Sequence, residues 1–237
     1  MTQLDLAAFD ALTFDCYGTL IDWEAGILAG LRAILGPRDG QPADDALLEA
    51  YAREEAALEA GPYLRYRDVV AGAGRAVAAS WGVTASGAEL AGFGGSVVDW
   101  PAFPDSADAL RRLHERFRLG VITNCDDDLF AASEARLGIA FDWVVTAQQV
   151  GSYKPSLHTF EAALARIDVP RERILHVAQS LFHDHVPARS LGLATVWIDR
   201  RHGRAGSGAT PPAEASPDLS APDMRTFADV ALGRVAR

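Results

Sequence analysis

Residues 11–22 read ALTFDCYGTLID, an apolar run that ends in the carboxylate Asp15 and continues into a turn containing Gly18. A short, continuously apolar run of this kind is typical of a strand that is buried on both faces of a parallel sheet. Four similar runs follow at residues 119–123, 141–146, 174–178 and 194–198. They alternate with helical patterns, so the sequence predicts an α/β fold with a parallel sheet and helices on both faces.

The helical segments are predicted from their end signals. Asp105 is expected to cap a helix over 107–116, and Pro155 falls in the first turn of a helix over 156–166. Two further helices are expected to begin near Asp127 and Asp184 and to end at Gly138 and Gly192. The tail 203–222 is rich in Gly, Ala, Pro and Ser, which predicts a mobile surface loop before a last helix over 224–232.

Residues 22–98 differ from the rest of the chain. They are rich in Ala, Leu, Glu and Arg with helical periodicity, and they show no convincing strand pattern. We therefore predict an all-helical cap domain over 22–98, inserted after the first strand of a core domain formed by 1–21 and 99–237.

The composition excludes several classes of protein. The 237 residues carry a formal net charge of −10, which argues against a general nucleic-acid binder. No apolar run approaches the roughly 20 residues of a membrane span, and the N-terminal residues lack the basic region of a signal peptide. Two cysteines cannot form a disulfide framework, so we expect a cytoplasmic protein.

Chemically capable side chains follow several of the predicted strands. Asp15 ends the first, Thr123 and Asn124 stand at the end of the second, Lys154 follows the third and Asp184 follows the fourth. In an open parallel sheet, ligands bind outside the carboxyl ends of the strands. The sequence therefore predicts that two carboxylates, a lysine and a hydroxyl–amide pair converge there.

These segments resemble the four motifs of the haloacid dehalogenase superfamily. Residues 15–22 (DCYGTLID) match the first motif, Thr123 and Asn124 the second, Lys154 with Pro155 the third, and Asp184 the fourth. The resemblance implies a Rossmann-like core with a helical cap, and a nucleophilic Asp15 that forms a covalent intermediate. It also implies that Thr19 orients Asp15 and that Lys154 offsets the repulsion between the two carboxylates.

Position 17 separates two reactions within the superfamily. Its phosphatases carry a second Asp there, which protonates the departing alkoxide, whereas this chain has Tyr17. Halide is a very weak base and needs no such acid, and the Asp-x-Tyr-Gly-Thr pattern is similar to that of the L-2-haloacid dehalogenases. Gln179 replaces an acid of the phosphatase pattern, so we expect no metal site and no cofactor.

The resemblance therefore implies a hydrolase that cleaves the carbon–halogen bond of a short 2-haloalkanoate through an aspartyl ester, with Asp184 acting on the water. Thr123 and the amides after Asp15 are expected to hold the substrate carboxylate, and Asn124 the leaving halide. The cap arginine that binds halide in those enzymes has no unique counterpart, because Arg53, Arg65 and Arg67 all compete. The expected substrate-binding set is Cys16, Tyr17, Thr123, Asn124, Arg53, Gln179, Ser180 and Phe160.

Two alternatives stay open. One is a Mg²⁺-dependent phosphatase acting on a small phosphate ester, and the other is a protein of this fold with another or no hydrolytic activity. His183 and His185 flank Asp184 but lack a third ligand at metal-binding spacing, and His176 is interpreted as a packed strand residue. We expect a small anionic substrate, neither nucleic-acid nor membrane partners, and a homodimer through the Ala/Leu-rich cap helices.

Overall fold

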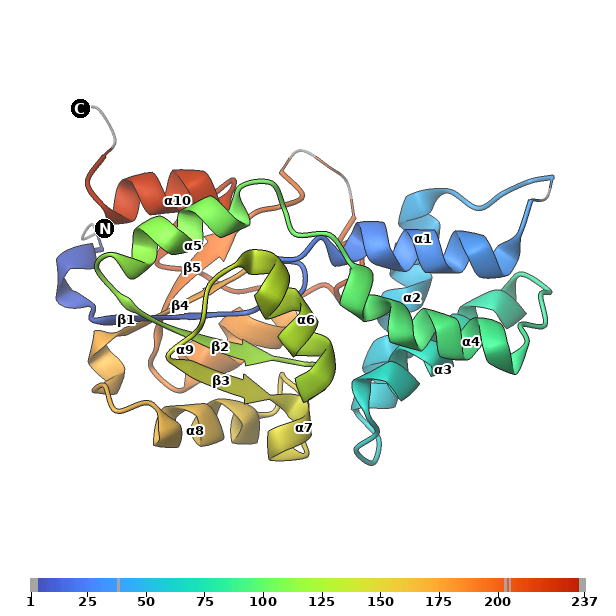
Figure 1. Ribbon diagram of the computed structural model, residues 1–237, viewed down its shortest axis with the longest axis horizontal. Coiled ribbons are helices and arrows are strands. Elements are labelled where there is room, and N and C mark those ends of the chain that lie inside the picture. The colour runs from blue at the N-terminus through green and yellow to red at the C-terminus, as the bar shows by residue number, and fades with distance from the viewer. Residues whose placement is uncertain (1–3, 38, 203, 205, 235–237) are drawn as a thin grey trace.

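The computed structural model describes residues 4–37, 39–202, 204 and 206–234. Six parallel strands form one sheet in the order β3-β2-β1-β4-β5-β6 (Figure 1). Their bounds are β1 Ala11–Phe14, β2 Arg118–Thr123, β3 Trp143–Thr146, β4 Ile174–Ala178, β5 Ala194–Ile198 and β6 Leu219–Ala221. The predicted α/β class with a parallel sheet is confirmed.

The register of the sheet aligns the ends of its central strands. Phe14 of β1 lies opposite Val121 of β2 on one side and Val177 of β4 on the other. The residues that follow these strands therefore emerge at the same edge of the sheet. Strand β1 is central and all four of its residues are buried, so the position of Asp15 is fixed from both sides.

Helices cover both faces of the sheet (Figure 1). Alternate residues of β1 face opposite sides: Leu12 and Phe14 belong to one hydrophobic cluster, and Ala11 belongs to another with Phe160 and Ala163. The first cluster contains residues of α5 Ser106–His114, α6 Asp127–Leu137 and α10 Met224–Ala231. The second contains residues of α8 Leu157–Arg166 and α9 Val186–Ser190, while the short α7 Ala147–Val150 precedes α8.

Four helices between β1 and α5 form a separate group, here called the helical lobe, at one end of the molecule (Figure 1). They are α1 Trp23–Leu35, α2 Asp44–Glu59, α3 Tyr66–Ser80 and α4 Gly87–Gly95, followed by a 3₁₀ turn at Ser96–Asp99. Local signals start two of them: Asp22 accepts a hydrogen bond from the amide of Ala25, and Ser86 and Glu89 form a capping box. No described residue between 22 and 98 lies in one of the six strands.

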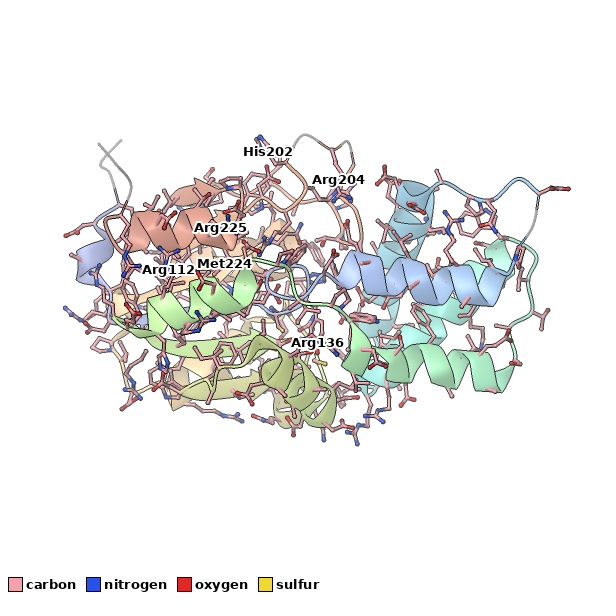
Figure 2. The ribbon with its side chains drawn as sticks, turned by 45° about the horizontal axis from the view of Figure 1, so that its top comes forward. Arg112, Arg136, His202, Arg204, Met224 and Arg225 are labelled. Atoms are coloured by element: carbon pink, nitrogen blue, oxygen red, sulfur yellow. The ribbon has the colours of Figure 1, made fainter. Side chains whose placement is uncertain are left out.

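The helical lobe is tied to the sheet near the end of β2. The buried carboxylate of Asp126 accepts hydrogen bonds from the amides of Tyr66 (3.0 Å) and Arg67 (3.3 Å) at the start of α3. Arg136 on α6 donates to the carbonyl of Val98 at 3.0 Å, and Figure 2 shows this arginine where α6 meets the helical lobe. These contacts hold α3, and with it α2, over the edge of the sheet where the predicted site residues emerge.

Three local predictions differ from the structure. The tail is not a mobile loop throughout, because residues 219–221 form β6 and Ala209 is fully buried; residues 203 and 205 lie outside the described part of the chain. Asp105 does not cap α5 with its side chain, because that carboxylate binds Arg200 (2.9 and 3.0 Å) and the amide of Met224 (2.7 Å). The helix expected near Asp184 begins as a π turn, Leu181–His185, before α9.

No helix in the described ranges combines the length and the apolar character that a membrane crossing requires.

Candidate active site

Lys154 lies at the centre of the predicted cluster. Its ammonium group donates to Asp15 Oδ1 at 2.9 Å, to Asp184 Oδ1 at 2.7 Å and to the carbonyl of Ile122 at 2.9 Å. A lysine ammonium has three N–H donors, so all of them are used. The lysine and both carboxylates are almost fully buried, and the structure therefore brings the three predicted catalytic groups into direct contact.

The three groups shift one another's protonation. Burial lowers the pKa of Lys154, but the two carboxylates outweigh burial and raise it above its ordinary value. Burial also acts to raise the pKa of Asp184, and there Lys154 and His176 outweigh it and hold that pKa well below its usual range. For Asp15 burial prevails over Lys154, so its pKa is raised.

Thr19 holds the second oxygen of Asp15. Its hydroxyl donates to Asp15 Oδ2 at 2.7 Å and accepts the amide of Gln179 at 2.9 Å. Both carboxylate oxygens of Asp15 thus accept a hydrogen bond, one from Lys154 and one from Thr19. The side chain is fixed in orientation by two different strand-end segments.

His176 supports Asp184 from inside β4. Its Nε2 lies 3.0 Å from Asp184 Oδ1, and its Nδ1 lies 2.9 Å from the hydroxyl of Thr13. A carboxylate only accepts, so Nε2 donates and, in the neutral ring, Nδ1 accepts from Thr13. The interpretation of His176 as a packed residue missed this contact. By contrast, Asp184 Oδ2 is buried and has no hydrogen-bond partner among the described residues.

A small cavity of about 20 Å³ adjoins this cluster. From the core it is lined by Asp15, Tyr17, Asn124, Lys154, Ser180, His183 and Asp184. From the helical lobe it is lined by Trp23, Glu55, Glu59 and Tyr66. The helical lobe therefore forms one wall of the site, and two of its contributions are carboxyl groups.

Glu55 and Glu59 were not predicted from the sequence. Glu55 Oε1 accepts from the hydroxyls of Tyr51 and Tyr66, both at 3.0 Å, and burial raises its pKa to about 7. Burial and the neighbouring Glu55 raise the pKa of Glu59 well above its ordinary value. The sequence contains a pattern that could have indicated them: Tyr51, Glu55 and Glu59 are four residues apart and share one face of α2.

The structure gives several predicted substrate-binding residues other contacts. Asn124 clamps the backbone of Lys154, accepting its amide at 2.7 Å and donating to its carbonyl at 3.0 Å. The hydroxyl of Tyr17 lies 3.0 Å from Ser133 Oγ and accepts from Cys125 Sγ at 3.3 Å. Cys125 and Cys16 are both buried, and burial raises the pKa of each thiol.

Of the other predicted residues, Ser180 lines the cavity and the rest lie outside its lining. Thr123 is fully buried, and its hydroxyl has no hydrogen-bond partner within the described chain. Ser180 lines the cavity, and its Oγ lies 3.2 Å from His183 Nδ1. Gln179 faces away, with its Oε1 3.4 Å from Thr210, and Phe160 packs edge-on against His176 behind the sheet.

The competing arginines do not reach the cavity. The side chain of Arg53 is 67% exposed and pairs with Glu54, at a groove on the other side of α2. Arg65 and Arg67 are partly exposed and pair with the buried Asp126 and the exposed Asp128. Lys154 is consequently the one cationic side chain among the described residues that line the cavity.

The donor set does not fit Mg²⁺. The ammonium of Lys154 bonds both Asp15 and Asp184, so it stands where a cation between these carboxylates would bind. Gln179 faces away, Asp126 is occupied with the start of α3, and magnesium favours several clustered oxygen ligands. Within the residues described, no group of three or more His, Cys, Asp or Glu is arranged to hold a metal.

Comparison with known proteins identifies the family. The family model for haloacid dehalogenase-like hydrolases matches residues 9–180. An (S)-2-haloacid dehalogenase of Pseudomonas putida is 26% identical over 198 residues, which cover 81% of this chain and 85% of that protein. A pyrimidine 5′-nucleotidase of Escherichia coli (strain K12) is 30% identical over 105 residues, 43% of this chain and 45% of the nucleotidase.

The fold is shared with solved structures. One is the L-2-haloacid dehalogenase from Xanthobacter autotrophicus with chloropropionic acid covalently bound, which superposes with a TM-score of 0.77. The match covers 96% of this chain and 100% of that chain at 18% identity, so it concerns the fold alone.

Proposed function

This chain belongs to the haloacid dehalogenase-like hydrolase family, and we propose that it hydrolyses a carbon–halogen bond next to a carboxylate through an ester on Asp15, without a metal. The observation that carries the proposal is the bonding of Lys154, which bridges Asp15 and Asp184 by hydrogen bonds of 2.9 and 2.7 Å. Lys154 acts against the burial that raises the pKa of Asp15 and so favours, without a metal ion, the charged carboxylate that a nucleophile requires.

The first step is attack by Asp15. One carboxylate oxygen forms a bond to C2 of the substrate while the carbon–halogen bond breaks, and the halide leaves with the bonding electrons. No proton is needed on the leaving group. This matches Tyr17, whose hydroxyl bonds Ser133 and Cys125 and has no hydrogen bond to Asp15 in the described structure.

The second step is attack by water on Cγ of the Asp15 ester. Asp184 Oδ2 is buried, lines the same cavity and has no other partner among the described residues, so it can accept a hydrogen bond from the water. The acyl–oxygen bond then breaks, one proton of the water passes to the departing alkoxide, and the other is released to solvent as Asp15 returns to its carboxylate form. The products are a 2-hydroxy acid and the free Asp15 carboxylate.

The amides that follow Asp15 and the hydroxyl of Thr123 are the candidates for holding the substrate carboxylate. The amides of Gly18, Thr19 and Leu20 donate to the carbonyls of Ile21 and Cys16, which leaves the amides of Cys16 and Tyr17 as the candidates in this turn. The unpartnered, buried hydroxyl of Thr123 at the neighbouring strand end supplies a further donor.

Removal of metal ions separates this proposal from a phosphatase, the activity that the nucleotidase relative favours. We expect the protein to release chloride from (S)-2-chloropropionate at the same rate in excess EDTA as in Mg²⁺, because no step uses a metal. Chloride release from both enantiomers, and phosphate release from a panel of phosphate esters, are measured under both conditions. Phosphate release that EDTA abolishes, without chloride release from either enantiomer, would overturn the proposal.

A further inference from the structure

The charges around the active-site cavity are unbalanced. Four carboxyl groups line it, those of Asp15, Asp184, Glu55 and Glu59, against the single ammonium of Lys154. That ammonium spends its three donors on Asp15, Asp184 and the carbonyl of Ile122, so it has none left for a substrate. The described cavity therefore holds more carboxyl groups than its one ammonium can pair.

The imidazole of His183 does not correct this imbalance. Burial lowers its pKa to about 4, so the ring is neutral at pH 7. Its Nε2 is buried, has no hydrogen-bond partner among the described residues and lies 3.7 Å from Glu59 Oε2. Glu59 itself accepts hydrogen bonds of 3.3 Å from Asn124 Nδ2 at both carboxyl oxygens, so the unsatisfied polar atom beside it is Nε2 of His183.

Glu59 lies between the active-site cavity and a larger groove. It lines the cavity beside Asp15, and it also lines an adjoining groove of about 390 Å³ whose other walls include Tyr63, Tyr153 and Phe182. Lys154 is shared in the same way. A molecule that reaches Asp15 from this groove meets the carboxyl group of Glu59 first.

An anionic group on this side finds no free cation among the described lining residues, and its charge raises the pKa of Glu55 and Glu59 further. An ammonium group lowers the pKa of both carboxyl groups and provides three donors, for Glu59 and for the unpartnered Nε2 of His183. Glu55 is held by Tyr51 and Tyr66, so it is oriented before a ligand arrives.

We propose that Glu55 and Glu59 make this enzyme select substrates that carry an alkylammonium group close to the reacting carbon, over simple 2-haloalkanoate anions. This inference rests on the proposed dehalogenase function and defines its substrate class. Glu59 binds the ammonium directly at the cavity wall, and Glu55 supplies the second negative charge. In the free pocket, where no cation is bound, both groups have raised pKa values, as burial without a counter-charge requires.

The test compares two isosteric substrates. 3-Amino-2-chloropropionate and 2-chlorobutyrate differ only in an ammonium group that replaces a methyl group. We expect kcat/KM for chloride release to favour the amino compound by at least about tenfold, the equivalent of one well-placed ionic hydrogen bond. In Glu59→Gln, which keeps the shape and removes the charge, this preference is expected to disappear.

Glu54→Gln is the matched control, because Glu54 lies on the same helix but pairs with Arg53 at the surface. We expect it to keep the wild-type preference. A wild-type preference for 2-chlorobutyrate, or a preference for the amino compound that survives Glu59→Gln, would overturn the inference.

A binding experiment keeps the inference testable if neither compound releases chloride. Calorimetry with 3-aminopropionate and butyrate, an isosteric pair without a leaving group, measures selectivity independently of chemistry. Tighter binding of 3-aminopropionate to the wild type but not to Glu59→Gln would support the ammonium site even if the dehalogenase function failed. Equal binding of the two compounds to the wild type would overturn it.

Discussion

Replacing Lys154 with methionine is expected to lower kcat/KM by at least about 10²–10³-fold and to destabilise the fold by about 3–5 kcal/mol. The substitution retains most of the side-chain volume but leaves Asp15 and Asp184 without the cation that both now contact. When one partner of a buried ionic cluster is removed, the charges that remain are buried without compensation, and their desolvation destabilises the fold. Chemical denaturation and initial rates of halide release measure the two effects.

Two further variants separate charge compensation from packing. Arg111→Met removes an exposed cation whose partner Asp108 is also at the surface, and we expect a loss below about 1 kcal/mol. The double variant Lys154→Met/Asp15→Asn should be more stable than Lys154→Met alone, since one uncompensated charge is gone. A Lys154→Met variant as stable as the wild type would contradict the role assigned to this lysine.

The second large effect is expected for Asp15→Asn. We expect this substitution to lower the rate of halide release by at least about a thousandfold without lowering the melting temperature. The amide cannot form the ester readily, so the chemistry stops at its first step. Stability is preserved because burial raises the pKa of Asp15, so its charged form is costly in the free protein. Lys154 and Asp184 still pair with each other in the variant.

Asp10→Asn serves as the control for this variant. Asp10 precedes β1 as Asp15 follows it, and it pairs with Arg173 at the surface, far from the cavity lining. We expect Asp10→Asn to keep the wild-type rate. Appreciable halide release by Asp15→Asn, or an equal loss of activity in Asp10→Asn, would be incompatible with a nucleophilic Asp15.

The convergence of Asp15, Lys154 and Asp184 was predictable because it follows from strand periodicity. Apolar runs locate β1, β3 and β4, and a parallel sheet brings the residues after these strands to one edge. Strand β6 could not be predicted in the same way, because it has only three residues, Leu219–Ala221, inside a polar, turn-rich tail.

The sequence patterns did not predict that the helical lobe forms one wall of the site. Periodicity shows which face of α2 is buried, but not that this face covers the ends of the strands. Glu55 and Glu59 continue the face begun by Tyr51, yet charged residues on a helix are usually solvated. Arg53 was predicted to bind the substrate anion. It lies two residues after Tyr51, on a different face of α2, and its side chain is exposed to solvent.

The most direct test of the central claim, that Asp15 is the nucleophile, is a single turnover in H₂¹⁸O with enzyme in excess over substrate. If Asp15 attacks carbon and water then attacks the ester carbonyl, the ¹⁸O enters the carboxyl group of Asp15, and the hydroxyl oxygen of the product is ¹⁶O. Mass spectrometry of the peptide that contains Asp15, and of the 2-hydroxy acid, locates the label. Labelled product together with an unlabelled Asp15 peptide would show direct attack by water and would contradict the account.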